Sequence, residues 1–285
     1  MGNTILIADS GSTKTDWVVV KDGSLAKSYC TKGINPYFQS FEEIKDEIEV
    51  SLIPQPAGIR VDAVYFYGAG CNADKAHIVR DAICFYVKNA DVDVYSDLLA
   101  AVHCTCGCNA GIACILGTGS NSCFYDGEKI VKNVPPLGFI LGDEGGGATL
   151  GRLLVSDILK GLMPDDLSRE FFSKYGLTQT EILDRVYRQP FPNRFLAGFS
   201  PFLYENIDVP EIRTIVFKNF VSFFTRNVLQ YDCKMYEVNF VGSVAYHYKD
   251  ILKEVADMLN IRIGKILKTP ISGLVDYYNL KNSQI

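Results

Sequence analysis

The fold of this chain is decided near its beginning, by residues 5–20, which read ILIADSGSTKTDWVVV. Two apolar runs flank a turn of small and polar residues, and this pattern predicts a β-hairpin. Such a turn leaves backbone N–H groups and hydroxyls available to hold an anion. Asp9 ends the first run, where its carboxylate can hold a hydrated Mg²⁺ ion, and Lys14 adds a positive charge. The stretch therefore predicts a phosphate-binding hairpin, with an ordinary surface hairpin as the alternative.

A second copy of this pattern follows 108 positions later (115 minus 7), because ILGTGS at 115–120 aligns with IADSGS at 7–12. An apolar run and a turn follow the second copy as they follow the first. Two such hairpins predict two domains that begin with the same phosphate-binding device and face each other across a cleft.

The composition limits the classes of function. With 285 residues, of which 48% are hydrophobic and 21% charged, the chain is long enough for about two domains with buried cores. Its 28 basic and 33 acidic residues give a net charge of −5, so no positive field attracts nucleic acid or an anionic membrane. No apolar run approaches the length of a membrane span, and no secretory signal opens the chain. We therefore expect a cytoplasmic protein with a small-molecule partner, no nucleic acid and no membrane.

The chain has nine cysteines, an odd number without an export signal, which argues against a disulfide framework. Three of them, Cys104, Cys106 and Cys108, lie close together beside His103 and form a candidate metal site. Their spacing lacks the two-residue gaps and the second ligand pair of zinc sites, so metal binding is not the preferred interpretation. Most of the nine cysteines are expected to be buried thiols.

In the first half of the chain, Pro36 moves Asn35 out of helical geometry and predicts a turn. Further on, a buried strand ends in GAGCNA at 68–73. This turn fits the dinucleotide fingerprint G-x-G-x-x-A, but that fingerprint normally opens the first βα unit of a fold. Close approach of the backbone to another ligand is the preferred explanation of the glycines. The elements predicted here are strands at 24–31 and 61–67 and helices over 41–52 and 74–87.

Asp97 stands where a strand predicted at 92–95 gives way to a helix that begins at Leu98. Ser96 and Asp97 are typical residues of a helix cap. The carboxyl ends of strands are also where α/β proteins place catalytic carboxylates. The residues alone favour the cap and leave the catalytic role open.

The second half contains LGFILGDEGGGA at 137–148, before a helix predicted at 149–160. Asp143 and Glu144 before three glycines predict a ligand-binding loop that leads into a helix N-terminus, with a flexible surface turn as the alternative.

The remainder is predicted to be mainly helical over 165–230, with a break between Pro190 and Pro210. The stretch 238–245 is predicted as a strand that runs into a turn at Gly242 and Ser243, and this turn is a third candidate nucleotide contact. The closing elements are predicted as a helix at 249–259, a strand at 261–267 and a helix at 272–280.

The order of these motifs resembles that of the sugar-kinase, actin and heat-shock chaperone ATPase superfamily. Within it, the chain is similar over nearly its whole length to the N-acetylglucosamine kinase branch and to the activator ATPases of benzoyl-CoA reductase and 2-hydroxyacyl-CoA dehydratase. The resemblance rests on DxGxTKT at 9–15, LGTGSN at 116–121 and VGSVA at 241–245, which look like the two phosphate motifs and the adenosine motif.

The resemblance implies an α/β fold of two actin-like ATPase (ribonuclease H-like) domains facing each other across a cleft, with mixed central sheets flanked by helices. The expected domains are 1–110, with the helix 271–285 as a candidate addition, and 111–270.

The resemblance also implies roles for residues. Asp97 falls where the kinases keep their catalytic base, and Asp9 is expected to hold Mg²⁺ through water. The expected ATP-binding residues are Asp9, Gly11, Ser12, Thr13, Lys14, Gly117, Thr118, Gly119, Ser120, Gly242 and Ser243. The expected substrate-binding residues are Asn35, Gly70, Asp143, Glu144 and Gly147.

The function so implied is phosphorylation of a hydroxyl of an amino sugar, with ATP and Mg²⁺ as cofactors, Asp97 as general base and N-acetylglucosamine as the first choice of sugar. The glycines at 145–147 are expected to leave room for an acyl group beside the sugar ring. The mammalian kinases carry bulkier residues after Gly145, which leaves the exact sugar open.

Two other functions stay open. One is an activator ATPase that couples hydrolysis to electron transfer through an iron–sulfur cluster at a dimer interface, although the C-x-C-x-C pattern does not look like the ligand arrangement of those activators. The other is a sugar-sensing protein without turnover. A homodimer also stays open.

Overall fold

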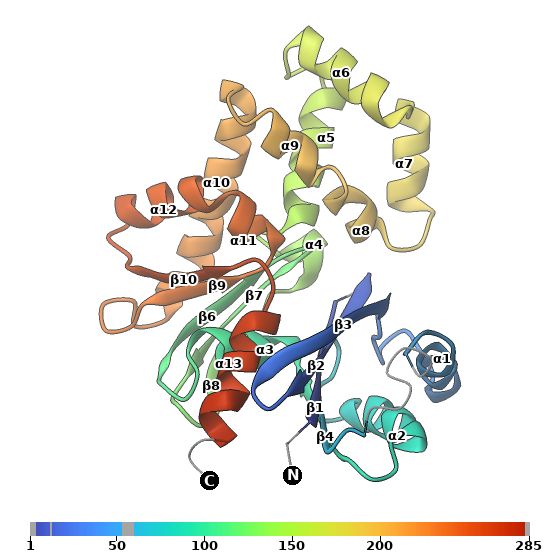
Figure 1. Ribbon diagram of the computed structural model, residues 1–285. Coiled ribbons are helices and arrows are strands. Elements are labelled where there is room, and N and C mark those ends of the chain that lie inside the picture. The colour runs from blue at the N-terminus through green and yellow to red at the C-terminus, as the bar shows by residue number, and fades with distance from the viewer. Residues whose placement is uncertain (1–3, 12, 53–59, 283–285) are drawn as a thin grey trace. The chain divides into compact units, whose positions relative to one another are not determined.

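The computed structural model describes residues 4–11, 13–52 and 60–282, which form two compact units (Figure 1). Unit 1 comprises the described residues of Met1–Asn109 and Thr269–Ile285, and unit 2 comprises Ala110–Lys268. The C-terminal helix therefore returns to the N-terminal unit, and in Figure 1 it lies beside the first strands of the chain.

Each unit is built on a five-stranded mixed sheet, and the two sheets have the same topology. The strand orders are β3-β2-β1-β4-β5 and β10-β9-β6-β7-β8. In both sheets the first strand pairs antiparallel with the second and parallel with the fourth. The predicted α/β fold with mixed central sheets flanked by helices is confirmed, and the sequence repeat corresponds to this repeated topology.

The strands of unit 1 follow from their apolar runs, since a central strand is covered on both faces and reads as continuously hydrophobic. The strands are β1 Thr4–Ser10, β2 Lys14–Lys21, β3 Ser24–Lys32, β4 Ala63–Gly68 and β5 Asp91–Ser96. The helices are α1 Phe41–Glu47, the π-helix η1 Ile48–Leu52, α2 Ala76–Tyr86, α3 Asp97–Thr105 and α13 Ile271–Asn282.

Unit 2 adds a larger set of helices to its sheet. Its strands are β6 Gly111–Leu116, β7 Ser120–Tyr125, β8 Ile130–Val134, β9 Val238–Val241 and β10 Ile263–Leu267. Its helices are α4 Gly138–Leu141, α5 Gly147–Leu159, α6 Asp165–Tyr175, α7 Gln179–Tyr187, α8 Pro192–Ala197, α9 Ser200–Glu205, α10 Pro210–Arg226, the 3₁₀ helix η2 Val228–Gln230, α11 Ser243–His247 and α12 Lys249–Met258.

Two sequence predictions in unit 2 are corrected. The expected break between Pro190 and Pro210 contains the helices α8 and α9, because the prolines lie in first turns, where the missing N–H removes no helical hydrogen bond. The helix expected from Thr149 begins at Gly147. The strand predicted to run into a turn at Gly242 and Ser243 does end there, at Val241, and α11 begins at Ser243.

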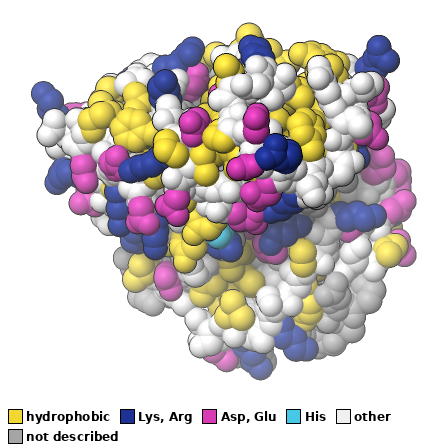
Figure 2. All heavy atoms as spheres, turned by 90° about the horizontal axis from the view of Figure 1, so that it is seen from above, with side chains coloured by type: hydrophobic (Ala, Val, Ile, Leu, Met, Phe, Trp, Pro, Cys, Tyr) yellow, Lys and Arg dark blue, Asp and Glu magenta, His cyan; other side chains and the backbone are white. Residues whose placement is uncertain are grey.

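The surface shows no dominance of one charge on the face drawn in Figure 2, where Lys and Arg side chains are interspersed with Asp and Glu side chains. This mixture agrees with the small net charge of −5. None of the helices in the described part of the chain combines the length and apolar character needed to cross a bilayer.

The C-terminal helix α13 is attached to α3 and β4 of unit 1 through a cluster of buried aromatic residues. The hydroxyl of Tyr67 lies 2.8 Å from His103 Nδ1 and 2.7 Å from the hydroxyl of Tyr278. The Tyr277 ring stacks on the His103 ring at a centroid distance of 4.1 Å. The two helices pack closely, because a Cβ on Gly273 would lie 2.4 Å from the Cys104 carbonyl oxygen.

This cluster predicts a loss of stability in acid. Burial, and secondarily the charge of Lys281, lower the pKa of His103 from 6.5 to about 4. Below pH 6.5 the unfolded chain takes up a proton that the folded chain refuses until about pH 4, so the stability falls over that window. Between pH 7.5 and 5 we expect a loss of about 2 kcal/mol from this group.

Urea unfolding of wild type and His103→Gln at the two pH values measures the effect, because glutamine keeps a hydrogen-bonding group without titrating. His77→Gln, at an exposed histidine of the same unit, is the control and should retain the wild-type pH dependence. An equal acid loss in His103→Gln would contradict the assignment.

Candidate active site

Parallel pairing brings the chemistry-bearing residues of unit 1 to one edge of its sheet. The register places Ser10 of β1 beside Gly68 of β4, and Gly68 beside Ser96 of β5. Asp9 precedes the first of these residues and Asp97 follows the last. Since the carboxyl ends of parallel strands converge, the two carboxylates lie near each other, as α/β sites require.

Asp97 is the first residue of α3, and its neighbour Ser96 is the N-cap. The Ser96 hydroxyl accepts from the Leu99 N–H at 3.2 Å, and Asp97 Oδ1 accepts from the Leu98 N–H at 2.9 Å. Burial raises the pKa of Asp97, whereas the backbone N–H groups oppose that rise. Because Ser96 supplies the cap, Asp97 is available for a second role, as a base stronger than an exposed carboxylate.

Asp9 lies in a group of like charges. Burial first, and then the nearby Asp97 and Asp16, raise the pKa of Asp9 to about 7, and Lys14 opposes this effect. Lys14 itself pairs with Asp16, with 2.6 Å between Nζ and Oδ2. The negative charge of Asp9 and its neighbouring carboxylates is therefore only partly compensated. This favours the binding of a divalent cation beside Asp9.

The donor set fits Mg²⁺ held together with a nucleotide. Among the described residues, no group of three or more His, Cys, Asp or Glu side chains is arranged to hold a metal ion by itself. Mg²⁺ typically takes one or two carboxylates and completes its shell with phosphate oxygens and water. Asp9 suits this mode of binding.

The clustered cysteines are not arranged as a metal site either, because Cys104, Cys106 and Cys108 do not form a metal-binding group among the described residues. Cys104 is buried, Cys106 is partly buried and Cys108 is exposed. The three sulfurs therefore lie in different surroundings at the end of α3.

Two of the expected substrate residues meet in unit 1. Gly70 has a φ of 79°, and a Cβ at this position would lie 2.3 Å from Asn35 Oδ1. Asn35 Oδ1 accepts from the Tyr37 N–H at 3.0 Å, which fixes the side chain. The next residue, Cys71, lies in the field of Asp97, which together with the larger effect of burial raises the pKa of its thiol to about 12. The structure thus places this glycine turn beside Asp97.

The first hairpin has the expected turn. The Gly11 N–H donates to the Lys14 carbonyl at 3.0 Å, and the Thr13 carbonyl accepts from the Gly33 N–H at 3.0 Å. The Thr13 side chain is exposed. Ser12 lies outside the described residues.

The second hairpin, in unit 2, is held by the start of α5. The Gly147 and Ala148 N–H groups donate to the carbonyls of Gly117 and Thr118, both at 2.8 Å. Asp143 also lies against this hairpin, since its Oδ1 accepts from the Ser120 N–H at 3.3 Å. Burial raises the pKa of Asp143, and this hydrogen bond opposes the rise.

Asp143 and Glu144 are adjacent in the chain but point to different places. Asp143 has a φ of 52°, in the left-handed region, which turns the backbone between them. Glu144 pairs with Arg226 at the end of α10, with 2.9 Å between Oε1 and Nε. Glu144 is therefore engaged away from the hairpin that Asp143 contacts.

The glycines after Glu144 serve close packing, which corrects the expectation that they leave room for an acyl group. A Cβ on Gly145 would lie 2.8 Å from Leu116, and one on Gly146 would lie 2.8 Å from the Gly119 backbone. A Cβ on Gly147 would lie 3.2 Å from the Gly117 carbonyl oxygen. The loop is glycine-rich because the hairpin backbone rests on it.

A cavity of about 290 Å³ opens beside the second hairpin, wholly within unit 2. It joins four predicted residues, Gly117, Thr118, Gly147 and Ser243, to others that the sequence did not indicate. Gly147 thus lies with expected nucleotide residues and not with expected sugar residues. Val244 belongs to the VGSVA motif, and the residues missed are Ala197, Ser200, Pro201, Tyr204, His247 and Tyr248.

Aromatic rings give this cavity its character. The Tyr204 and His247 rings meet edge to face at 5.3 Å, and the Tyr248 hydroxyl donates to the Ser200 carbonyl at 2.6 Å. A mainly apolar pocket with aromatic walls next to a phosphate-binding turn suits a nucleobase. The run Tyr246-His247-Tyr248 after the third motif is a usable signal in the sequence, but nothing there connects it to Tyr204.

The third motif depends on Gly242. Its φ is 126°, and a Cβ there would lie 2.2 Å from the Leu116 carbonyl oxygen. Only glycine therefore lets the end of β9 pass the second hairpin and lead into α11.

Comparison with known proteins places these features in context. A scan against protein-family models found no match, and a search of curated proteins found none either. Among solved structures, a "putative N-acetylglucosamine kinase" from Porphyromonas gingivalis is 46% identical, with a TM-score of 0.95, and the match covers 98% of this chain and 99% of that one.

Two more distant structures share the fold. A second "putative N-acetylglucosamine kinase", from Chromobacterium violaceum, is 16% identical with a TM-score of 0.75, and the match covers 96% of this chain and 98% of that one. A ROK family glucokinase from Streptomyces griseus, in complex with glucose and AMPPNP, is 17% identical with a TM-score of 0.60 and coverages of 98% and 99%.

Proposed function

Because the chain belongs to the N-acetylglucosamine kinase-like family of the sugar-kinase and actin-like ATPase superfamily, we propose that it transfers the γ-phosphoryl group of ATP to a hydroxyl of N-acetylglucosamine. The observation that carries the proposal is the position of Asp97. It lies at the carboxyl edge of the unit 1 sheet, beside Asp9 and the glycine turn at Gly70, and the helix cap is supplied by another residue. A carboxylate placed in this way suits deprotonation of a hydroxyl.

In the proposed reaction, Asp97 accepts the proton of the sugar hydroxyl as the oxygen forms its bond to the γ-phosphorus. The bond between that phosphorus and the β–γ bridging oxygen breaks, and ADP and a sugar phosphate leave. In a loose transition state the hydroxyl loses its proton late, so a carboxylate with a modestly raised pKa is an adequate base. Asp9 would hold Mg²⁺ through water, and the ion would supply positive charge that offsets the charge on the phosphates.

We assign the nucleotide to the glycine turns and to the aromatic cavity. The backbone N–H groups around Thr13 and Gly119 would position the phosphates, with Lys14 as an added charge. Tyr204 and His247 would flank the base, next to Ser243. The ring-lined cavity of about 290 Å³ supports this assignment.

We assign the sugar to Asn35, Gly70 and Asp143. The first two are held together in unit 1, and the amide of Asn35 is rigid enough to select a hydroxyl pattern. The N-acetyl preference rests on family membership alone, because the packed glycines at 145–147 give it no support.

The expected result for the wild-type protein is turnover of N-acetylglucosamine, with kcat/KM on the order of 10² above that for glucose, since unpaired polar groups in the site penalise the sugar that lacks the acetamide. A coupled ADP-release assay with N-acetylglucosamine, N-acetylmannosamine and glucose measures it. Asp143→Asn should raise KM for the sugar, and Asp126→Asn, at an exposed turn of the same unit, is the matched control.

Equal kcat/KM for glucose would contradict the N-acetyl assignment while leaving a sugar kinase. Absence of turnover with every sugar, in a protein that binds ATP, would contradict the kinase itself.

A further inference from the structure

A second polar cavity, of about 270 Å³, lies between α5, α10 and the end of α4. It shares no lining residue with the aromatic cavity at the second hairpin. Since a water molecule fills about 30 Å³ in the liquid, the cavity has room for a small ligand. Its polar lining residues include Glu144, Arg152, Lys218, Asn219, Ser222 and Arg226.

Positive charge dominates this lining. Three cations face one carboxylate, a balance of +2 in a chain whose net charge is −5. Arg226 pairs with Glu144 at 2.9 Å. Arg152 and Lys218, by contrast, are exposed at the mouth of the cavity and make no ion pair with any residue that the structure describes. The cavity therefore has two uncommitted cations.

A buried donor lies in the same wall. Asn219 is only 3% exposed, and its Oδ1 accepts from the Gly145 N–H at 3.1 Å. That bond fixes the orientation of the amide, because only the oxygen can accept a hydrogen bond. The other end, Nδ2, has no hydrogen-bond partner among the described residues. Buried donors are nearly always paired, so this one indicates a missing acceptor.

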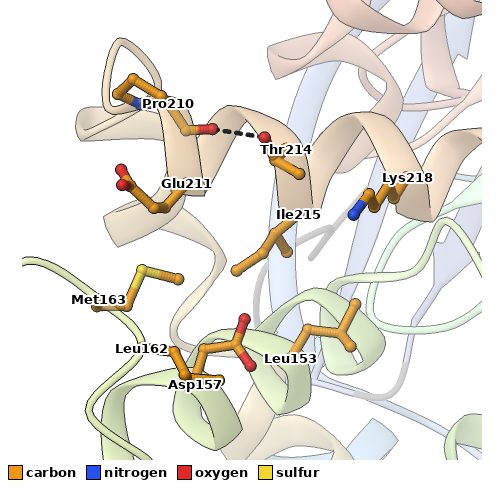
Figure 3. A pocket seen from close by; sticks show the side chains of 9 residues that line it. All are labelled: Leu153, Asp157, Leu162, Met163, Pro210, Glu211, Thr214, Ile215 and Lys218. Atoms are coloured by element: carbon orange, nitrogen blue, oxygen red, sulfur yellow. Dashed lines mark hydrogen bonds between the residues drawn. The ribbon is translucent and has the colours of Figure 1, made fainter.

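A neighbouring cavity shows the opposite character. This larger cavity, of about 410 Å³, shares Leu153 and Lys218 with the cavity at Asn219. Its lining, however, carries the carboxylates Asp157 and Glu211 (Figure 3). Its Thr214 hydroxyl is already used, donating to the Pro210 carbonyl at 2.7 Å. Carboxylates repel anions, so of the two spaces only the one at Asn219 suits an anion.

We propose that the cavity at Arg152, Lys218 and Asn219 binds the phosphate group of a small phosphorylated molecule. Two uncommitted cations match a dianion, and a guanidinium binds phosphate oxygens in a bidentate manner. Asn219 Nδ2 is buried within this wall and would reach a further phosphate oxygen through a small shift of the lining side chains. Ile140 and Leu141, both exposed in this wall, contact the rest of a phosphate ester.

Occupancy has a mechanical consequence for the loop before α5. Asn219 holds the Gly145 N–H, and Arg226 holds Glu144. A phosphate bound to the same asparagine restricts that loop, which also carries Asp143. The site thus connects the level of a phosphorylated metabolite to the second hairpin.

Calorimetric titration tests the proposal, with inorganic phosphate and glycerol 3-phosphate as probes that distinguish the free ion from an ester. Saturating AMPPNP keeps the probes out of the nucleotide site. We expect both to bind wild type, and Arg152→Gln and Lys218→Gln each to weaken binding about tenfold, as loss of a charge-assisted hydrogen bond does. Lys253→Gln, an exposed lysine of α12 that lines neither cavity, should bind as wild type does.

Hydrogen exchange at the Gly145 amide locates the site, since phosphate at the wild-type dissociation constant should slow it clearly in wild type and much less in Arg152→Gln. Asn219→Asp keeps the acceptor oxygen but puts a second carboxylate oxygen in place of the donor, and should abolish binding. If that variant fails to fold, the two cation variants decide.

No heat of binding at millimolar probe, or equal affinities in Arg152→Gln, Lys218→Gln and Lys253→Gln, would overturn the proposal. None of these readouts uses phosphoryl transfer, so they stand apart from the kinase assay.

Discussion

Asp97→Asn lowers kcat by on the order of 10² to 10⁴, while the sugar and ATP still bind. Asparagine keeps the shape of the side chain and an oxygen that accepts the Leu98 N–H, but it cannot take a proton from a hydroxyl. Ser96 retains the N-cap, so α3 stays formed and the loss is in chemistry. A coupled assay gives kcat, and calorimetry on the same preparation gives the sugar affinity.

Asp91→Asn is the matched control, because it makes the same change at the exposed start of β5. The pH profile adds a second readout. Burial raises the pKa of Asp97, so log kcat of the wild type falls as the pH drops through that raised value and the base becomes protonated. The residual activity of Asp97→Asn should lack this fall. A folded Asp97→Asn protein with turnover near that of Asp91→Asn would remove Asp97 from the role of base.

Gly242→Ala is the second change with a large expected effect, a loss of about 3 kcal/mol in the free energy of unfolding of unit 2 and at least a tenfold rise in KM for ATP. The added Cβ would lie 2.2 Å from the Leu116 carbonyl oxygen, and the φ of 126° is one that alanine avoids. The backbone of the second hairpin must move to accept it. Urea unfolding followed by circular dichroism measures the first effect, and initial rates measure the second.

The control separates the two causes of strain. Gly161 also has a positive φ, of 67°, but nothing lies within 4 Å of the position of its Cβ. Gly161→Ala should therefore lower the free energy of unfolding by only about 1–2 kcal/mol, the effect of the unfavourable φ alone. It should leave KM for ATP unchanged. If Gly242→Ala has no more effect than Gly161→Ala, the close passage of β9 and the second hairpin is not a requirement of the site.

Local pattern was sufficient for much of the candidate site. The alternation of apolar runs and small-residue turns predicted both hairpins, and strand ends followed by polar residues indicated Asp9 and Asp97. Proline was the misleading signal, since Pro192 and Pro201 start helices and do not break them. The aromatic cavity escaped prediction because Tyr204 and His247 are brought together by packing of helices that no motif connects.

The sequence by itself determined the two repeated sheets and the position of carboxylates at the strand ends, because these depend on periodicity and on short-range turn chemistry. The tertiary structure decided where Asp143 and Glu144 point, since the left-handed backbone of Asp143 is set by its contacts with Ser120 and Thr149. It also decided that the glycines at 145–147 support a hairpin and that a polar cavity lies behind them. That cavity depends on Asn219 meeting Gly145, 74 residues away, and contacts of such separation exist only once the helices have packed.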